Sequence, residues 1–150
     1  MPGENVPEFL AKKKADAVSH LVNDAIVIAA DTVVLLDHHI LGKPKDAADA
    51  KNILQQLSGR VHKVVTGICI RKGGKEVGFS TTTEVHFRKL TDAQIAHYIT
   101  NYKPYDKAGA YAIQEWIGVL GIERINGDYY NVMGLPIGEV AGVLKREFGI

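Results

Sequence analysis

The apolar positions of the chain follow two different spacings, one typical of helices and one typical of strands. Residues 8–22 carry apolar side chains at roughly helical intervals among Ala and Lys, and this pattern predicts a helix. Residues 25–30 form a continuous apolar run that ends at Asp31 and is too short for a helix. Such a run indicates a strand covered on both faces, as in the parallel sheets of α/β proteins.

The rest of the chain predicts helices and strands in alternation. Asp46 suits the N-cap of a helix over 47–57, and the Gly73-Gly74 pair predicts the turn of a hairpin. The other expected elements are strands over 32–36, 61–71 and 77–87, helices over 93–100 and 136–148, irregular chain over 102–112 and an apolar run over 116–125. This alternation favours an α/β fold with a mixed, partly parallel sheet flanked by helices.

Length and composition narrow the class of protein. A chain of 150 residues without an interdomain linker predicts one domain. Its net charge of +1 argues against a nucleic acid polymer as partner. The single cysteine, Cys69, lies in an apolar run and suits a buried thiol in a reducing compartment. No apolar run of about eighteen residues and no secretory signal occur, so we expect a cytoplasmic protein without membrane contact.

Polar residues at the ends of the expected elements are the candidates for chemistry. Asp31 ends a buried strand, where open α/β sheets place ligands, although an aspartate there can also bond to a turn. Arg60, His62 and Thr66 are spaced to share one face of a strand. That face is either an anion site, since arginine suits phosphate, or the solvated side of an amphipathic strand.

Two further features have equally open interpretations. Small residues around Gly109 let a ligand approach the backbone, and Gln114 carries the donors and acceptors that read a nucleobase edge, but such loops are common. Lys14 and Lys43 are either phosphate ligands or solvated side chains. The six histidines show no spacing typical of a zinc site.

Taken in order, six blocks of the chain resemble the Maf family of nucleoside triphosphate pyrophosphatases. The matching blocks are 30–34, 41–44, 59–67, 82–87, 106–114 and 127–136. Each block alone is unspecific, and their order over nearly the whole chain carries the resemblance. The blocks over 107–114 and 129–136 look like the branch of the family that hydrolyses dTTP and UTP.

The resemblance implies a Maf/ITPase-like domain with a nucleotide-binding cleft, which releases pyrophosphate from dTTP or UTP with the help of Mg²⁺ or Mn²⁺. It implies that Asp31 accepts a proton and contacts the metal, and that Thr32 and Gln114 select the base. Lys14 and Lys43 match lysines expected near the phosphates. Arg60 and Lys107, which lie in matching blocks, are further expected substrate ligands, and a homodimer is an expected assembly.

The chain also departs from the family pattern. Family members open with a strand and an S-x-S-P-R-R loop whose arginines contact the triphosphate, and that loop sequence does not occur here. We therefore expect residues 1–150 to be a single Maf-like domain without that strand and loop, and a poor catalyst. Two alternatives stay open: a nucleotide-binding remnant without turnover, and a regulatory protein that inhibits septum formation.

Overall fold

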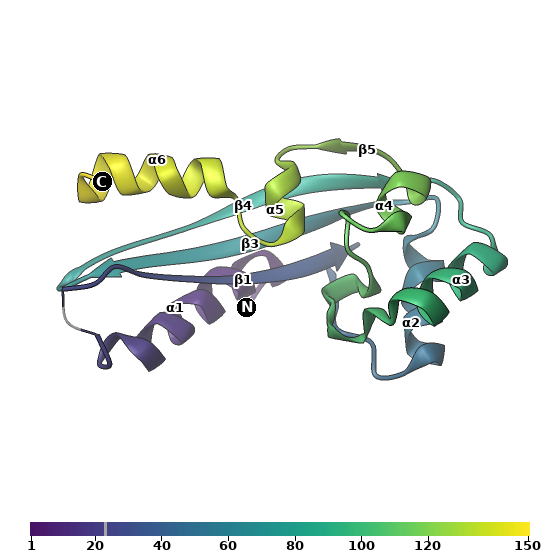
Figure 1. Cartoon of the computed structure of the whole chain (residues 1–150), viewed down its shortest axis with the longest axis horizontal. Helices are drawn as coiled ribbons and strands as arrows, with labels where there is room; N and C mark the ends of the chain where they lie inside the picture. Colours follow the sequence, from purple (N-terminus) through teal and green to yellow (C-terminus); the bar gives the residue numbers. More distant parts are fainter. Residues whose placement is uncertain (23) are drawn as a thin grey trace.

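The computed structural model describes residues 1–22 and 24–150, and a five-stranded sheet in the order β2-β1-β3-β4-β5 forms its centre (Figure 1). The strands are β1 Val27–Leu36, β2 His39–Leu41, β3 Val61–Lys72, β4 Lys75–Phe87 and β5 Ile122–Asn126. The α-helices are α1 Val6–Ser19, α2 Ala47–Leu57, α3 Asp92–Tyr102, α4 Trp116–Gly121, α5 Tyr129–Met133 and α6 Ile137–Phe148. Short 3₁₀ turns are η1 Gly3–Asn5, η2 Pro104–Asp106 and η3 Ala108–Ala110.

All the strand pairs in this sheet are antiparallel, so the α/β class is confirmed and the expectation of a partly parallel sheet is wrong. The apolar run of β1 is only partly covered, since Ala29 is buried whereas Ile28 is 44% exposed. Ala29 and its neighbour Cys69 on β3 pack against α1, whereas Ile68 and Ile70 pack against α6 on the opposite face. Helices on both faces of an antiparallel sheet therefore give the sequence pattern that parallel sheets usually show.

Helix α1 lies directly on the backbone of the sheet. A Cβ added at Gly67 would overlap the backbone of Pro7 and Glu8, so only glycine allows this approach. Ala11 and Ala15 of the same helix are fully buried against the strands. Lys14 lies between these two alanines in the helix. The close packing therefore places its ammonium beside Ala30, at the end of the apolar run in β1.

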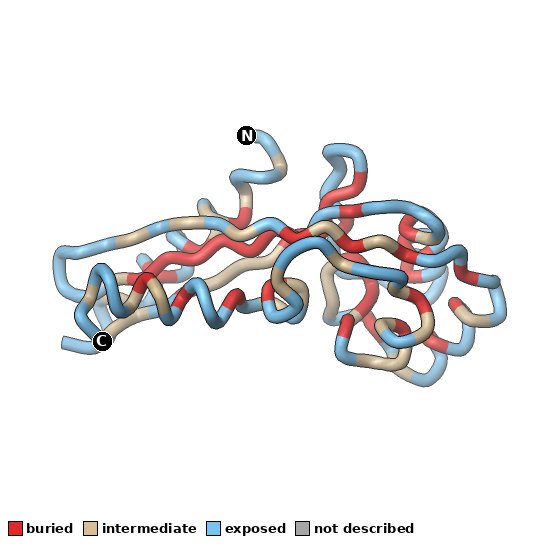
Figure 2. Tube along the Cα trace, turned by 90° about the horizontal axis from the view of Figure 1, so that it is seen from above, coloured by how far each residue is buried: buried red, intermediate tan, exposed pale blue. Residues whose placement is uncertain are grey.

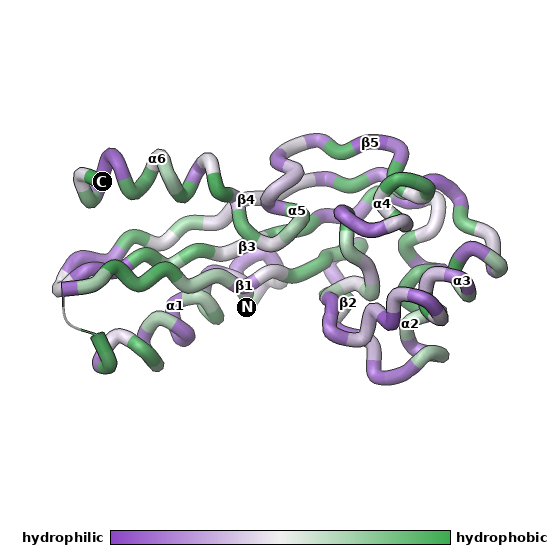
Figure 3. Tube along the Cα trace, viewed as in Figure 1, coloured by the Kyte–Doolittle hydropathy of each residue, from purple (hydrophilic) through white to green (hydrophobic). Residues whose placement is uncertain are grey.

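The second half of the molecule gathers around a larger core. Figure 2 shows buried positions along the central strands and again among the helices at the far end of the sheet. In Figure 3, hydrophobic residues follow one another along the central strands, whereas hydrophobic and hydrophilic residues are mixed along α2 and α3. Leu54, Leu57, Ile95 and Tyr98 are the central side chains of this core.

Most of the expected elements occur close to their expected bounds. β1 runs without a break through Asp31, however, so the expectation that this residue ends a strand is wrong. The helix over 47–57 is confirmed with its cap, since Asp46 Oδ1 accepts the Asp49 N–H at 2.8 Å. The run over 116–125 divides into α4 and β5, and α5 is an element that the sequence did not indicate. Cys69 is buried as expected. In the described part of the chain, no helix combines the length and apolar character needed to cross a membrane.

Candidate functional site

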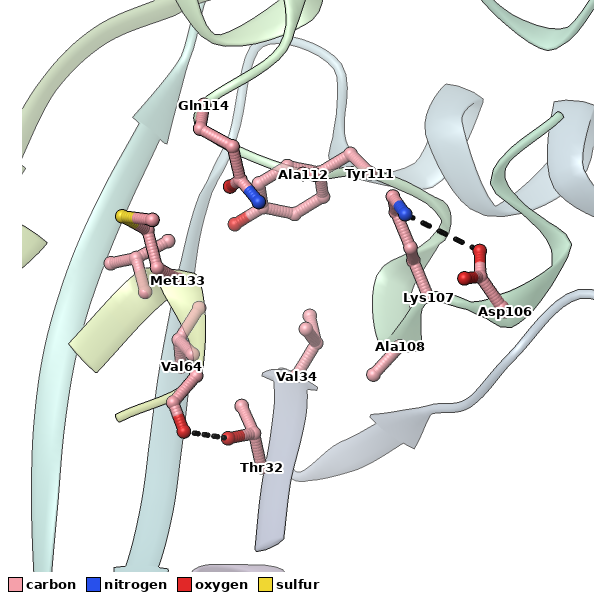
Figure 4. A pocket seen from close by; sticks show the side chains of 12 residues that line it. Thr32, Val34, Val64, Asp106, Lys107, Ala108, Tyr111, Ala112, Gln114 and Met133 are labelled. Carbon is pink, nitrogen blue, oxygen red and sulfur yellow. Dashed lines mark hydrogen bonds and ion pairs between the residues drawn. The ribbon is translucent and has the colours of Figure 1, made fainter. Parts of the chain in front are cut away.

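A pocket of about 240 Å³ opens on one face of the sheet, between β1, β3, the segment 106–114 and the end of α5 (Figure 4). Thr32 and Val34 on β1 and Val64 on β3 point into it from the sheet. Gln114 lies across the opening from Thr32, and Lys107 lies at its flank. The complete lining is Thr32, Val34, Val64, Asp106, Lys107, Ala108, Tyr111, Ala112, Gln114, Val132, Met133 and Gly134.

Hydroxyl groups join the sheet side of the pocket to α5. Thr32 Oγ1 lies 2.8 Å from Thr66 Oγ1, because the two residues are cross-strand neighbours of β1 and β3. The Thr66 hydroxyl donates to the Asn131 carbonyl at 3.3 Å, and Thr32 Oγ1 lies 3.4 Å from the Gly134 carbonyl. The backbone that follows α5 is thereby held against the strand residues that form the pocket.

Asn131 is the buried anchor of α5 and was missed by the sequence analysis. Its side chain is fully buried, and its Nδ2 lies 3.2 Å from the Val64 carbonyl and 3.0 Å from the Thr81 carbonyl. Nδ2 also lies 3.0 Å from Thr83 Oγ1. The available signal was the occurrence of this asparagine in the matching block 127–136, since a short helix of five residues gives no clear periodicity.

A second buried polar contact lies at the wall of the pocket that Tyr111 forms. His62 Nε2 and Tyr111 Oη lie 2.7 Å apart, and both rings pack against Phe87. Burial, with a smaller contribution from the charge of His86, lowers the pKa of His62 to about 4, so its imidazole is neutral at neutral pH. Burial also raises the pKa of Tyr111. The solvated-face interpretation is therefore wrong for His62 and Thr66, which are buried.

Asp31 lies on the other face of the sheet. Successive residues of a strand point to opposite faces, so Asp31 faces α1 while Thr32 faces the pocket, and Asp31 is not among the pocket residues. Its Oδ1 accepts a hydrogen bond from Lys14 Nζ at 2.9 Å, and the same ammonium lies 3.0 Å from the Ala30 carbonyl. The Asp31 side chain is 19% exposed, and that of Lys14 is 55% exposed.

The remaining candidate lysines lie at the pocket side. Lys107 forms an ion pair with Asp106 at 3.3 Å and lowers the pKa of that carboxyl. Lys43 also lowers the pKa of Asp106 through its charge, and the Gly42 carbonyl before it accepts the Gly109 N–H at 3.1 Å. Arg60 is separate from this group, because it is exposed and forms an ion pair with Asp37.

The structure thus brings Thr32, Gln114 and Lys107 to one pocket, with Lys43 near its flank. Asp31 and Lys14 form a pair across β1 from that pocket, and Arg60 lies outside it. In residues 1–22 and 24–150, no group of three or more His, Cys, Asp or Glu side chains is placed to hold a metal ion.

The chain matches a known protein family over nearly its whole length. The family described as Maf-like protein matches residues 2–147, and the chain belongs to this family. It is 47% identical over 143 residues to the dTTP/UTP pyrophosphatase of Cytophaga hutchinsonii, a match covering 95% of this chain and 66% of that protein. The dTTP/UTP pyrophosphatase of Phocaeicola vulgatus is 45% identical over 147 residues, covering 97% of this chain and 76% of the relative.

A third relative, the dTTP/UTP pyrophosphatase of Porphyromonas gingivalis, is 47% identical over 149 residues, covering 97% of this chain and 74% of the relative. The chain therefore spans about two thirds to three quarters of the length of these three relatives.

Proposed function

We propose that this chain binds the base of dTTP or UTP in the pocket and hydrolyses the nucleotide to the monophosphate and pyrophosphate. The observation that carries the proposal is the convergence of Thr32 from β1 with Lys107 and Gln114 from the segment 106–114 on one pocket. The similarity to relatives named dTTP/UTP pyrophosphatases supports the choice of substrate. The pocket volume of about 240 Å³ is below the range of about 300–1,000 Å³ typical of drug-sized ligands, and therefore suits one small ring.

The hydroxyl groups at the pocket floor favour a base with an N–H donor. The Thr66 hydroxyl has one hydrogen, and the contact with the Asn131 carbonyl uses it. The Thr32 hydroxyl donates its own hydrogen either to Thr66 Oγ1 or to the Gly134 carbonyl, and in both cases Thr32 Oγ1 keeps a lone pair as an acceptor in the pocket. Uracil and thymine present an N–H at ring position three, where cytosine presents an acceptor. Gln114, across the pocket, supplies the amide that pairs with a second polar atom of the base.

Asp31 is the proposed general base. Its carboxylate takes a proton from a water molecule, whose oxygen forms a bond to the α-phosphorus. The bond from this phosphorus to the bridging oxygen breaks, and pyrophosphate leaves with the electron pair. Because Asp31 lies across β1 from Thr32, the phosphates must pass the side of β1 that is not paired with β3. In the described residues, β2 covers that side of β1 only at 34–36.

A divalent cation, Mg²⁺ or Mn²⁺, fits this arrangement only together with the substrate. The donor set at this position is one carboxylate, beside the ammonium of Lys14. Hard divalent cations in such sites take one or two carboxylates and complete their shell with phosphate oxygens and water. Asp31 would hold the ion, which neutralises phosphate charge when bound. Lys14, Lys43 and Lys107 are the proposed cationic ligands of the phosphates.

The test is turnover of UTP with saturating Mg²⁺ by the Asp31→Asn variant. This substitution keeps the shape of the side chain and removes the proton acceptor, so we expect a loss of about 10²–10⁴-fold in kcat. Asp16→Asn is the matched control, because Asp16, a residue of α1, is also held in an ion pair, with Arg71 at 2.6 Å. An Asp31→Asn enzyme within about threefold of the parent chain would exclude the general-base role.

The position of Asp31 outside the pocket favours a second candidate function, nucleotide binding without turnover. Calorimetric titration with UMP and assay of pyrophosphate release from UTP separate the two functions. Binding of UMP with no pyrophosphate release would favour the second.

A homodimer is also part of the proposal. Exposed apolar side chains in α5 and at the start of α6 support it, namely those of Tyr130, Met133 and Ile137. Its test is the molar mass measured by light scattering.

A further inference from the structure

We infer that Tyr98, a residue outside the pocket, positions Gln114 and thereby contributes to the selection of the base; this inference rests on the proposed function. Tyr98 belongs to α3, and its side chain is fully buried. Its hydroxyl accepts the Ala112 N–H at 3.1 Å and donates to Glu115 Oε1 at 2.6 Å. The two partners flank Gln114 along the chain. One hydroxyl from another element therefore holds both sides of the residue that faces the base.

Gln114 lies at the corner of a tight turn that these contacts enclose. The Glu115 N–H donates to the Ala112 carbonyl at 3.1 Å, which closes a four-residue turn with Gln114 at its third position. The hydroxyl of Tyr98 thus bonds to the two residues that close the turn. Without it, the turn would keep one hydrogen bond of its own and lose both of its links to α3.

The ring of Tyr98 is a rigid support for this hydroxyl. It stacks on Tyr102 with ring centroids 5.0 Å apart and lies 6.5 Å from the ring of Trp116, which begins α4 directly after the turn. Burial and the hydrogen bond to Glu115 raise the pKa of Tyr98, so the hydroxyl keeps its proton and remains a donor. The Tyr102 and Trp116 rings lie 6.4 Å apart, so the three rings pack as one cluster that restricts the movement of the Tyr98 phenol.

Helix α4 supports the turn from the other side. A Cβ added at Gly118 would overlap the Ile113 carbonyl oxygen, so the helix backbone lies directly against the turn. The Gly118 N–H donates to the Glu115 carbonyl at 2.9 Å. The turn is therefore held between Tyr98 and α4, and Gln114 extends from its tip into the pocket (Figure 4). This arrangement fixes the distance between the Gln114 amide and the acceptor at Thr32.

The experiment compares Tyr98→Phe with Tyr102→Phe. Both substitutions remove one hydroxyl from the same aromatic stack, but only Tyr98 bonds to the turn. We expect Tyr98→Phe to lower the ratio of UTP to CTP specificity constants about three- to tenfold, mainly through KM, with kcat for UTP little changed. A merely structural role would lower activity with both nucleotides equally. Tyr102→Phe is expected to keep the parent ratio.

A readout without turnover tests the same contact. Amide hydrogen exchange measured by NMR should show faster exchange at Ala112 in Tyr98→Phe and unchanged exchange in Tyr102→Phe. Glu115→Gln retains an acceptor oxygen and should keep most of the UTP preference, whereas Glu115→Leu should behave like Tyr98→Phe. The Glu115 pair keeps the inference testable if Tyr98→Phe does not fold.

The outcomes separate this inference from the proposed function. A parent chain that fails to bind UMP in calorimetric titration overturns the proposed function and the inference with it. If the parent chain prefers UTP and Gln114→Leu abolishes that preference, the proposed function stands. An unchanged preference in Tyr98→Phe or, if that variant does not fold, in Glu115→Leu then overturns the role of Tyr98.

Discussion

The neutral, buried His62 makes a quantitative prediction about the pH dependence of stability. Its pKa falls from 6.5 to about 4 in the folded chain, so the unfolded chain binds a proton in this range that the folded chain does not. The free energy of unfolding therefore decreases as pH falls through this window. At about 1.4 kcal/mol per pKa unit, the full effect is about 3 kcal/mol, of which about 2 kcal/mol develops between pH 7.5 and pH 5.

The perturbation is His62→Gln, which removes the titrating ring and keeps a polar partner for the Tyr111 hydroxyl. At pH 7.5 this variant should be less stable than the parent, because it loses the ring contact with Phe87. The difference between the two free energies of unfolding should shrink as the pH falls, by about 2 kcal/mol at pH 5. Only the parent has a ring whose protonation is suppressed by folding.

The assay is urea denaturation of both chains, followed by far-ultraviolet circular dichroism at several pH values between 5 and 7.5. Each carboxylate that titrates in this range is common to the two chains, so the difference between their free energies of unfolding isolates His62. His20→Gln, at the exposed end of α1, is the control and should follow the parent curve. Parallel curves for His62→Gln and the parent would refute the argument that burial suppresses protonation of this ring.

Two other substitutions test the packing and the base site. Gly67→Ala should lower the free energy of unfolding by about 2–4 kcal/mol in urea denaturation, because its Cβ overlaps the backbone of α1, whereas Gly74→Ala has open space and should cost little. Equal effects of the two would contradict the close approach of α1 to β3. Gln114→Leu should reduce the UTP over CTP preference by an amount equivalent to about 1–3 kcal/mol, and an unchanged ratio of specificity constants would place base selection elsewhere.

The sequence predicted the elements of the fold better than their pairing. Helical spacing and the Asp46 cap were sufficient for α2, since both signals are local. The direction of β1 relative to β3 was not visible, because a strand of a sheet with helices on both faces can have the same apolar run in either orientation. α5 was too short to show a period, and its anchor Asn131 is recognisable only through contacts with β3 and β4.

In the candidate site, too, the sequence indicated single residues better than the contacts between separate elements. The family resemblance selected Thr32, Gln114 and Lys107, which the fold brings to one pocket. The spacing of Arg60, His62 and Thr66 predicted that they share one face of a strand. Arg60, however, precedes the first residue of β3 and forms an ion pair with Asp37. The bond between Tyr98 and the turn at Gln114 joins residues on separate elements, and no local spacing indicates it.

The most direct test of the account is hydrolysis of UTP with Mg²⁺ in water enriched in heavy oxygen, with the products analysed by mass spectrometry. Attack of water on the α-phosphorus places one heavy oxygen in UMP and leaves pyrophosphate unlabelled. Because this is the step proposed for Asp31, the Asp31→Asn variant should release both products about 10²–10⁴-fold more slowly. Formation of UDP and phosphate, or heavy oxygen in the pyrophosphate, would contradict the proposed reaction.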